Sequence, residues 1–470
     1  MDDRKEVPLT RMRVAITVGE AIIARNILTE EFVDSFFSTL EASEVTIIAD
    51  EAIAQDIRTR VGAHAQVVTF ARGKETARER AIMSLARSGL PTRTNLWTKM
   101  RAYTRGDIGL LSAYRKRVFT ALFAHSSLFK RFVRFLIIRY TSDKEATECI
   151  RSLQPDVLVC LSLTNFNFDV PLARAARQQK VPLLGMVRSW DNLSSHGLLR
   201  VVPDRFFLQN VFLRDMATKY QGISVSRVPM SIVGLPHYDA YLRARDTLIP
   251  KVQFFASVGF SPEEKLVFYG AMGEFLFVEE MGAIEVMNAM ARDGAFGPRA
   301  RVLVRAHPKF KPPPEKLAQF THVVFDGDTS YLDEKGKGLT SEERYMHALS
   351  YADAVVTAAS TVAVDAIPFG RRAICVGFDG ARKDMPYWLS VKRYYDCYTH
   401  FEAFMETGAA AYAPTPQDLA KEVLASFTPS YVDEAARKRA QALLLDPLDG
   451  NAGRRLGEEL ARGLNAYARP

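Results

Sequence analysis

Residues 353–380 read DAVVTAASTVAVDAIPFGRRAICVGFDG. The short apolar run 353–357 predicts a buried strand that leads through small residues into the pair Ser360-Thr361. A helix is expected next, ending near Gly370, and the apolar run 373–376 predicts another strand. Apolar runs alternate with helical stretches in this way along most of the chain, which predicts an α/β fold of parallel sheets covered by helices on both faces.

The predicted strands fall into two sets. At 470 residues the chain is too long for one ordinary core, so two or three domains are expected. In the first half the expected strands are 13–18, 45–49, 67–70, 157–161, 183–187, 205–208 and 231–233. In the second half they are 265–269, 301–305, 322–325, 354–357 and 373–376. We therefore predict two Rossmann-like domains, at 1–245 and 246–450, with a hinge at 241–253 and a C-terminal helix in 451–470 that crosses back to the first domain.

Composition narrows the class of protein. The chain is 48% hydrophobic and 25% charged, which is typical of a soluble globular protein. Its N-terminal residues are polar and lack the apolar core of a signal peptide or membrane anchor, so a cytoplasmic location is expected. Four cysteines without CxxC spacing indicate free thiols rather than disulfides or zinc ligands, and no metal site is expected.

A basic segment at about 95–145 interrupts the strand pattern and predicts a helical insertion in the first domain. Ten of its residues are basic: Lys99, Arg101, Arg105, Arg115, Lys116, Arg117, Lys130, Arg131, Arg134 and Arg139. Between Lys99 and Arg139 the one acid is Asp107. The interleaved aromatic residues are Trp97, Tyr103, Tyr114, Phe119, Phe123, Phe129, Phe132 and Phe135. This composition is typical of helices on an anionic membrane surface, but it also fits nucleic-acid binding or a solvated face whose aromatic residues pack inward.

Ligands of open α/β sheets bind beyond the carboxyl ends of the strands, so two such domains facing each other are expected to form a cleft between these loops. In the first domain, residues 188–197 read RSWDNLSSHG. Arg188, Trp190 and Asn192 are candidates for binding an acceptor. Asp191 or His196 could take the proton of an acceptor hydroxyl, given burial or a charged neighbour. In the alternative interpretation, Asp191 belongs to an Asx turn and His196 is a surface residue.

Three loops of the second domain combine glycines, cations and hydroxyls. After the strand at 265–269 come Gly270, Gly273 and Glu274, where glycines allow a ligand to approach the backbone. At the end of 301–305 come Arg305, His307 and Pro308, and the Arg305 and His307 side chains could neutralise a departing diphosphate. In the alternative interpretation, Arg305 forms only a surface ion pair. After 354–357, Ser360 and Thr361 precede a helix whose amides could receive phosphate, while Asp365 could accept hydrogen bonds from a ribose. Ser360 or Thr361 could instead be an ordinary N-cap.

Other stretches at strand ends are weaker candidates. The turn at 234–239, GLPHYD, should bring His237 and Asp239 to the edge of the first domain. Thr329, Ser330 and Tyr331 are expected in a mobile loop, and residues 395–400 are expected to face the cleft.

The order of these motifs resembles glycosyltransferases built from two Rossmann domains, the GT-B architecture. The nearest patterns are those of bacterial surface and capsular polysaccharide synthesis proteins and of CDP-glycerol glycerophosphotransferases, and the resemblance spans most of 150–465. It implies that the Arg-x-His-Pro motif, here Arg305, His307 and Pro308, supplies positive charge for the donor diphosphate. It also implies that Ser360, Thr361 and Asp365 hold the phosphates and ribose. The tail DPLDGNAGRRLGEEL at 446–460 resembles the closing Asp-Gly-x-x-x-x-Arg helix of the same proteins.

The first half is also similar to UDP-N-acetylglucosamine 2-epimerases and their relatives, with two departures. Their His-x-Glu-Ala-Gly loop is replaced by MVRSW at 186–190, so epimerisation is not expected. The Asp-Tyr-Ser-Ser turn of the glycerophosphotransferases is replaced by Ala358-Ala359-Ser360-Thr361, which favours a sugar nucleotide over a glycerol-phosphate donor.

The resemblance and the residues together imply a metal-independent glycosyltransferase without a cofactor. Its substrates would be a nucleotide-sugar donor and a lipid-linked or polysaccharide acceptor in bacterial surface carbohydrate synthesis. We expect it in the cytoplasm, in peripheral contact with the anionic inner membrane face through 97–140, and we do not expect nucleic acid as a partner. A CDP-polyol phosphotransferase and a non-catalytic protein that binds sugar nucleotides or polysaccharide are the alternatives.

Overall fold

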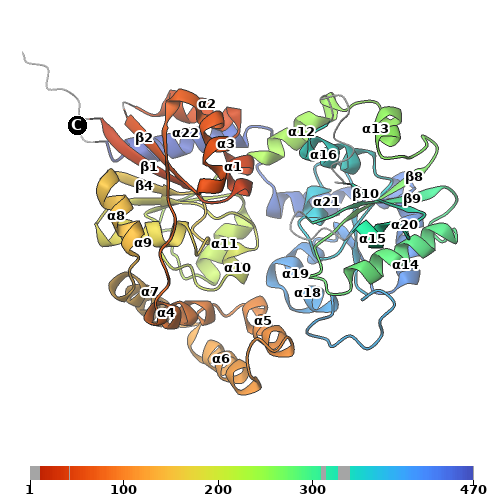
Figure 1. Cartoon of the computed structure of the whole chain (residues 1–470), viewed down its shortest axis with the longest axis horizontal. Coiled ribbons are helices and arrows are strands. Elements are labelled where there is room, and N and C mark those ends of the chain that lie inside the picture. The colour runs from red at the N-terminus through yellow and green to blue at the C-terminus, as the bar shows by residue number, and fades with distance from the viewer. Residues whose placement is uncertain (1–10, 42, 308–313, 327–338, 469–470) are drawn as a thin grey trace, which may run out of the picture. The chain divides into compact units, whose positions relative to one another are not determined.

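The computed structural model describes residues 11–41, 43–307, 314–326 and 339–468. The chain forms two compact units (Figure 1). The first unit contains Met1–Leu96, Tyr114–Asp239 and Leu443–Pro470, and the second contains Trp97–Ala113 and Ala240–Ala442. Pro308, Thr329, Ser330 and Tyr331, which the sequence analysis singled out, lie outside the described residues.

The first unit is built on a parallel sheet with the strand order β3-β2-β1-β4-β5-β6-β7. Its strands are β1 (Met12–Val18), β2 (Ser43–Ala49), β3 (Gln66–Thr69), β4 (Val157–Cys160), β5 (Leu183–Gly185), β6 (Arg205–Leu208) and β7 (Met230–Ile232). All seven were predicted, β6 with the observed ends and the other six with ends shifted by one or two residues. Strand β5 ends at Gly185 rather than at 187, where the predicted strand ended. Met186 and Val187 are fully buried but lie in the loop that follows the strand.

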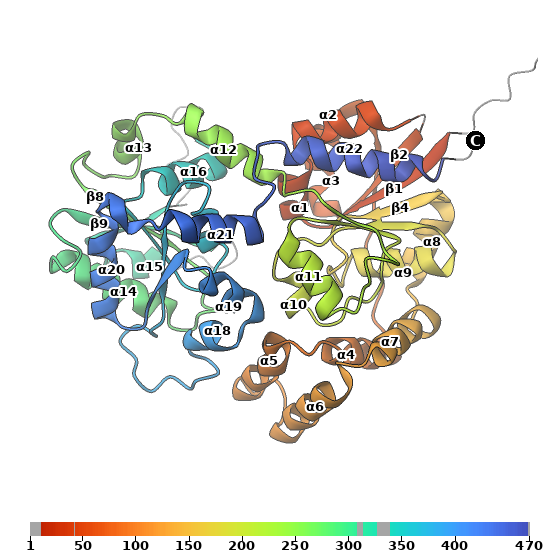
Figure 2. The same ribbon diagram turned by 180° about the vertical axis from the view of Figure 1, so that it is seen from behind.

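Helices cover both faces of this sheet, as expected when parallel strands are joined by crossovers. They are α1 (Ala21–Ile27), α2 (Glu30–Thr39), α3 (Ala54–Val61), α4 (Ala77–Ser88), α7 (Ser127–Tyr140), α8 (Lys144–Leu153), α9 (Asp169–Gln178), α10 (Asn192–Ser195), α11 (Val211–Lys219) and α22 (Ala452–Asn465). Short 3-10 turns lie at Glu51–Ile53 and Gly62–His64. Helices α2 and α22 lie side by side in both views (Figures 1 and 2).

The C-terminal segment is part of the first unit's core. Leu456, Leu460 and Leu464 of α22 are buried in the same cluster as Phe32 and Phe36 of α2. The turn at 234–239 supports this packing, because the carboxylate of Asp239 accepts hydrogen bonds from the amides of Ala452 (3.1 Å) and Gly453 (2.8 Å). Asp239 therefore caps the first turn of α22.

The second unit has a parallel sheet with the strand order β10-β9-β8-β11-β12-β13. Its strands are β8 (Lys265–Gly270), β9 (Ala300–Arg305), β10 (Val323–Asp326), β11 (Ala354–Thr357), β12 (Ala373–Val376) and β13 (Ala410–Ala413). The sequence analysis missed β13 because its residues, AAYA, include no β-branched side chain and form too short a run to show a pattern.

The helices of the second unit follow its strands. They are α13 (Lys251–Ser257), α14 (Glu280–Arg292), α15 (Pro314–Leu317), α16 (Ser341–Tyr351), α17 (Val362–Asp365), α18 (Lys392–Cys397), α19 (Thr399–Glu406), α20 (Pro416–Ser426) and α21 (Glu434–Leu444), with a 3-10 turn at Pro429–Tyr431. The hinge predicted at 241–253 lies in α12 (His237–Thr247) and the start of α13. The predicted helix up to Gly370 is wrong in length, because Pro368 lacks an N–H and the chain continues after α17 in tighter i to i+3 turns.

The basic segment is helical, as predicted, and forms α5 (Arg93–Thr104), α6 (Leu110–Phe123) and α7. Within the second unit, Trp97 stacks on Trp388 with ring centroids 4.7 Å apart, and the guanidinium of Arg101 lies over the ring of Phe275. In the first unit, α7 lies beside α4 in both views (Figures 1 and 2). None of the helices in the described ranges has the length and apolar content needed to cross a bilayer.

Candidate functional site

Strands of the second unit end in one row. Across β10, β9, β8, β11 and β12, the paired residues are Asp326, Arg305, Gly270, Thr357 and Cys375. Neighbouring strands are about 4.8 Å apart. The loops that carry Arg305-His307, Gly273-Glu274 and Ser360-Thr361 therefore leave the same edge of the sheet from three adjacent strands.

Arg305 is held by a network rather than by a surface ion pair. Its Nη1 and Nη2 donate to the carbonyl oxygen and Oγ of Ser341, both at 2.9 Å. Nη1 also lies 3.5 Å from the buried carboxylate of Asp326, which accepts a 2.7 Å hydrogen bond from Nε of Arg344. This network fixes a cationic group at the end of β9, and His307 lies partly exposed two residues further on.

Tyr345 connects Arg305 with Asp365. The guanidinium of Arg305 lies 4.8 Å from the centre of the Tyr345 ring, and the Tyr345 hydroxyl donates a 2.8 Å hydrogen bond to Asp365. Burial and the neighbouring Asp365 raise the pKa of Tyr345 well above its ordinary value, so its hydroxyl stays a donor. The sequence analysis missed Tyr345. The capping box formed by Thr340 and Glu343, a pattern visible in the sequence, marks the start of its helix α16.

The turn that was predicted to bind phosphate, at Ser360 and Thr361, leads into the short helix α17. Ser360 Oγ accepts a weak hydrogen bond from the amide of Val362 at 3.4 Å, while Thr361 is exposed and its side chain does not cap α17. Asp365 is buried, with its carboxylate on the Tyr345 hydroxyl. Ser360 and Thr361 thus lie at the strand ends and are at least partly exposed, whereas Asp365 supports Tyr345 from inside the unit.

The glycines at the end of β8 and in the loop that follows it make contacts within the protein. The amides of Met272 and Gly273 each donate a 2.6 Å hydrogen bond to the buried carboxylate of Glu280, and a Cβ on Gly270 would lie 2.6 Å from Val362 Cγ2. Burial raises the pKa of Glu280 to about 7 against the opposing effect of these hydrogen bonds. Glu274 is exposed on the same loop.

Residues 395–400 contribute to the packing of this edge. The hydroxyl of Tyr395 donates a 2.7 Å hydrogen bond to the carbonyl of Val376, where β12 ends. Burial raises the pKa of Tyr395 well above its ordinary value. Tyr395 thus anchors α18 to the sheet.

In the first unit, Asn192 organises the loop after β5. Its Oδ1 accepts hydrogen bonds from the amides of Arg188 and Ser189, both at 3.1 Å, and from Thr164 Oγ1 at 2.8 Å. Asn192 is fully buried, and Trp190 packs against Phe212. Two of the three predicted acceptor residues therefore shape the loop, and the third, Arg188, is partly exposed.

Arg188 forms an ion pair with Glu20, a residue that the sequence analysis missed. Glu20 follows β1, whose Thr17 pairs with Cys160 of β4, and Cys160 pairs in turn with Gly185 of β5. A carboxylate two residues after the end of the first strand is the sequence signal that could have identified it.

Asp191 and His196 are close enough to act together. His196 Nε2 lies 3.8 Å from Asp191 Oδ2, which also accepts a 2.8 Å hydrogen bond from Ser195 Oγ. Burial lowers the pKa of His196, with Arg188 and Arg200 acting in the same direction and Asp191 opposing them. A neutral imidazole beside a carboxylate can accept a proton at neutral pH. The side chain of Asp191 does not cap α10, so the predicted Asx turn is not formed at this helix start.

Asp169 is a buried acid that the sequence analysis did not select. It accepts hydrogen bonds from Thr17 Oγ1 and from the amide of Ser162, the latter at 3.2 Å. Burial raises its pKa to about 7, and the charge of Glu20 acts in the same direction. An acid that opens a helix and is followed directly by the apolar residues 170–173 is the available sequence signal.

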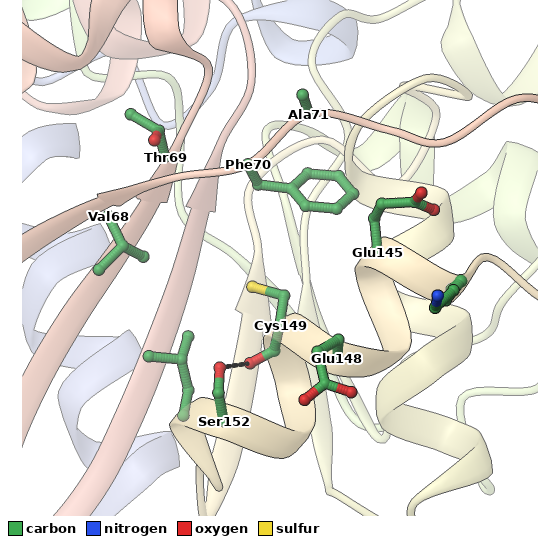
Figure 3. A pocket seen from close by; sticks show the side chains of 10 residues that line it. Val68, Thr69, Phe70, Ala71, Glu145, Glu148, Cys149 and Ser152 are labelled. Carbon is green, nitrogen blue, oxygen red and sulfur yellow. Dashed lines mark hydrogen bonds between the residues drawn. The ribbon is translucent and has the colours of Figure 1, made fainter.

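A pocket of about 590 Å³ lies elsewhere in the first unit, between the end of β3 and α8. Figure 3 shows the carboxylates of Glu145 and Glu148 on its α8 side, with Cys149 and Phe70. Carboxylates repel phosphate, so this pocket does not suit a nucleoside diphosphate. In the part of the chain that the structure describes, no cluster of three His, Cys, Asp or Glu residues is placed to hold a metal ion.

The strand orders and the paired parallel sheets define the GT-B fold, so the predicted fold class is confirmed. No family model matches the sequence, and no curated protein matches it. Solved structures resemble the chain over nearly its whole length. One is a putative UDP-N-acetylglucosamine 2-epimerase from Listeria monocytogenes, with a TM-score of 0.53 and 12% identity over 98% of both chains.

Two further structures have the same fold. The UDP-GlcNAc 2-epimerase from Neisseria meningitidis bound to UDP-GlcNAc has a TM-score of 0.52 and 13% identity, covering 96% of this chain and 100% of that one. A glycosyltransferase from Rickettsia africae has a TM-score of 0.51 and 9% identity, covering 97% of this chain and 99% of that one. At these identities the likeness shows the fold alone.

Proposed function

We propose that this protein is a metal-independent glycosyltransferase that moves a sugar from a nucleotide donor to a lipid-linked or polysaccharide acceptor. The observation that carries this proposal is the connected set Arg305, Tyr345 and Asp365 at the strand ends of the second unit. It holds a cation where this fold presents its ligands. Structures of the same fold include one bound to UDP-GlcNAc, which supports a nucleotide sugar as the donor.

In the proposed reaction, the bond from the sugar anomeric carbon to the diphosphate oxygen breaks, and a nucleoside diphosphate leaves with the electron pair. An acceptor hydroxyl forms the new bond to that carbon. Arg305 and His307, with the Ser360 and Thr361 hydroxyls, would bind the charge that gathers on the leaving diphosphate. Asp365 would keep Tyr345, and through it Arg305, in position.

The acceptor's proton requires a base, and we assign this role to Asp191 of the first unit, with His196 as the second choice. The carboxylate of Asp191 is partly exposed and hydrogen-bonded to Ser195. Arg188 would bind the acceptor beside them. Bacterial surface carbohydrate, capsule included, is the proposed product, made at the cytoplasmic face of the membrane.

A thermal-shift panel of UDP, CDP, GDP and their sugar conjugates, without added metal, tests the donor site. A ligand at a hundred times its Kd stabilises the folded protein by about 2.7 kcal/mol. We expect one nucleotide to raise Tm and the Arg305→Ala variant to bind it about 10- to 100-fold more weakly, because a charged hydrogen bond to phosphate is lost. Ser360→Ala should weaken binding less.

Arg301 provides the matched control. It lies at the other end of β9, where it pairs with Glu264 at 3.5 Å, so Arg301→Ala should bind nucleotide as the wild type does. Equal loss in Arg301→Ala, or no shift with any nucleotide, would contradict the proposed site. A preference for CDP would favour the polyol phosphotransferase. Binding without transfer to any acceptor would favour the non-catalytic alternative.

A further inference from the structure

Helix α7 exposes the side chains that a surface helix usually buries. Lys130 is 3% exposed, and Arg134 faces the unit, where it donates to the carbonyls of Leu199 (3.0 Å) and Gln221 (2.9 Å). In contrast, Leu128 is 74% exposed, and Phe132 and Phe135 are each 55% exposed. The interpretation in which the aromatic residues of the basic segment pack inward is therefore wrong for Phe132 and Phe135.

These exposed apolar residues form a stripe. Their spacing of four and then three residues places Leu128, Phe132 and Phe135 on one face of α7. Opposite them, Val133 and Ile137 pack into a small core with residues of α4 and α9. Since that core already holds α7 in place, the outward stripe is not needed to attach the helix.

Helix α6 adds a second stripe. Tyr114, Val118 and Leu122 recur every four residues and are 62%, 46% and 68% exposed. The ring of Phe119 meets that of Phe129 at 5.4 Å between centroids, which ties α6 to α7. Residues 114–140, which we call the basic helix pair, thus expose apolar side chains on both of their helices.

The charge of the basic helix pair is of one sign. From Tyr114 to Tyr140 the sequence contains seven Lys or Arg residues and no Asp or Glu. Arg115, Arg131 and Arg139 are exposed among the apolar side chains. A second copy of the same surface would bring like charges together, which disfavours self-association. Nucleic acid would use the cations and rings but not the exposed Leu and Val side chains.

We propose that the basic helix pair lies on the surface of an anionic lipid bilayer. Leu128, Phe132 and Phe135 enter the boundary between headgroups and acyl chains, and Arg131 and Arg139 reach lipid phosphates. The strength of such binding increases with the apolar area that enters the bilayer and with the attraction of basic residues to anionic lipid. This binding is independent of the proposed transfer reaction.

Co-sedimentation of the full chain with vesicles tests the proposal. The probes are vesicles of phosphatidylcholine alone and of equimolar phosphatidylcholine and phosphatidylglycerol. We expect binding to the mixed vesicles, weakened by salt, and little binding to phosphatidylcholine. Phe132→Ser with Phe135→Ser should lower the partition coefficient at least about tenfold. Arg131→Gln with Arg139→Gln should lower it about fivefold for each residue.

Matched controls change side chains of the same kind elsewhere. Val252→Ser with Leu424→Ser removes exposed apolar residues, and Arg151→Gln removes an exposed arginine of α8. These variants should bind vesicles as the wild type does, and circular dichroism should show every variant folded. Equal binding of the Phe132→Ser and Phe135→Ser double variant would overturn the proposal. So would equal binding to both vesicles, displacement by duplex DNA, or a wild-type dimer that this variant converts to a monomer.

Discussion

Asn192, Asp239 and Glu280 are polar residues in the first turns of helices α10, α12 and α14 that direct their side chains into the protein. Each satisfies backbone amides, and each was at or next to a predicted ligand loop. A buried carboxylate or amide oxygen that accepts several such bonds fixes the shape of a loop. The sequence shows which polar residues follow a strand, but the direction of their side chains depends on neighbours that are distant in the chain.

Asp191 is the residue on which the proposed chemistry depends most. Replacing it with Asn keeps the size and removes the base, so kcat should fall by about 10²- to 10⁴-fold while stabilisation by nucleotide is unchanged. Initial rates and thermal shifts on the same preparation measure both. Asp215→Asn, at an exposed acid of α11, is the control and should keep full activity. Turnover near the wild-type rate in Asp191→Asn would remove Asp191 from the mechanism.

At the scale of elements, apolar runs predicted twelve of the thirteen strands in the described residues, and three of them, β6, β11 and β12, with the observed ends. The pattern does not separate pairing from burial. Val187 is as buried as a strand residue but pairs with no strand, whereas Ala410–Ala413 pairs with β12 although three of its four residues are alanines. The apolar runs therefore predicted where the strands lie, but not the residues at which most of them end.

The loop after β8 should respond to pH through Glu280. Its folded pKa of about 7 lies above the ordinary 4.5, so the folded state binds the proton more tightly. Stability from this group is fully present below pH 4.5 and is lost as pH rises through about 7, by roughly 3 kcal/mol in total. Glu280→Gln carries no titrating group and should lack this loss.

Denaturant unfolding at several pH values, followed by tryptophan fluorescence, measures this effect. The free energy of unfolding of the wild type, less that of Glu280→Gln, should decrease across this pH range. Glu279→Gln, one residue earlier and partly exposed beside Arg382, should show no such change. A difference that does not vary with pH would mean that the pKa of Glu280 is the same in the folded and unfolded states.

At the scale of the whole molecule, the chain contains two sheets of the same design with different loops at their carboxyl ends. The fold could be predicted because alternation of strand and helix is local in the sequence. The site could be predicted only in part: Arg305 and Ser360 belong to recognisable motifs, while Tyr345 and Glu20 become relevant only when strands distant in the sequence lie side by side. The exposure of the apolar face of α7 could not be predicted from the sequence either. Two of the residues that this helix turns toward the protein are the cations Lys130 and Arg134, and their partners are distant in the chain.

The most direct test of the donor site is hydrogen–deuterium exchange of the full chain with and without UDP, or with whichever nucleoside diphosphate the thermal panel selects. We predict slower exchange at short times in peptides covering 265–275, 301–307 and 354–366, and unchanged exchange in peptides covering 183–200 of the first unit. Protection confined to the first unit, or none at a concentration that raises Tm, would contradict a donor site at the strand ends of the second unit.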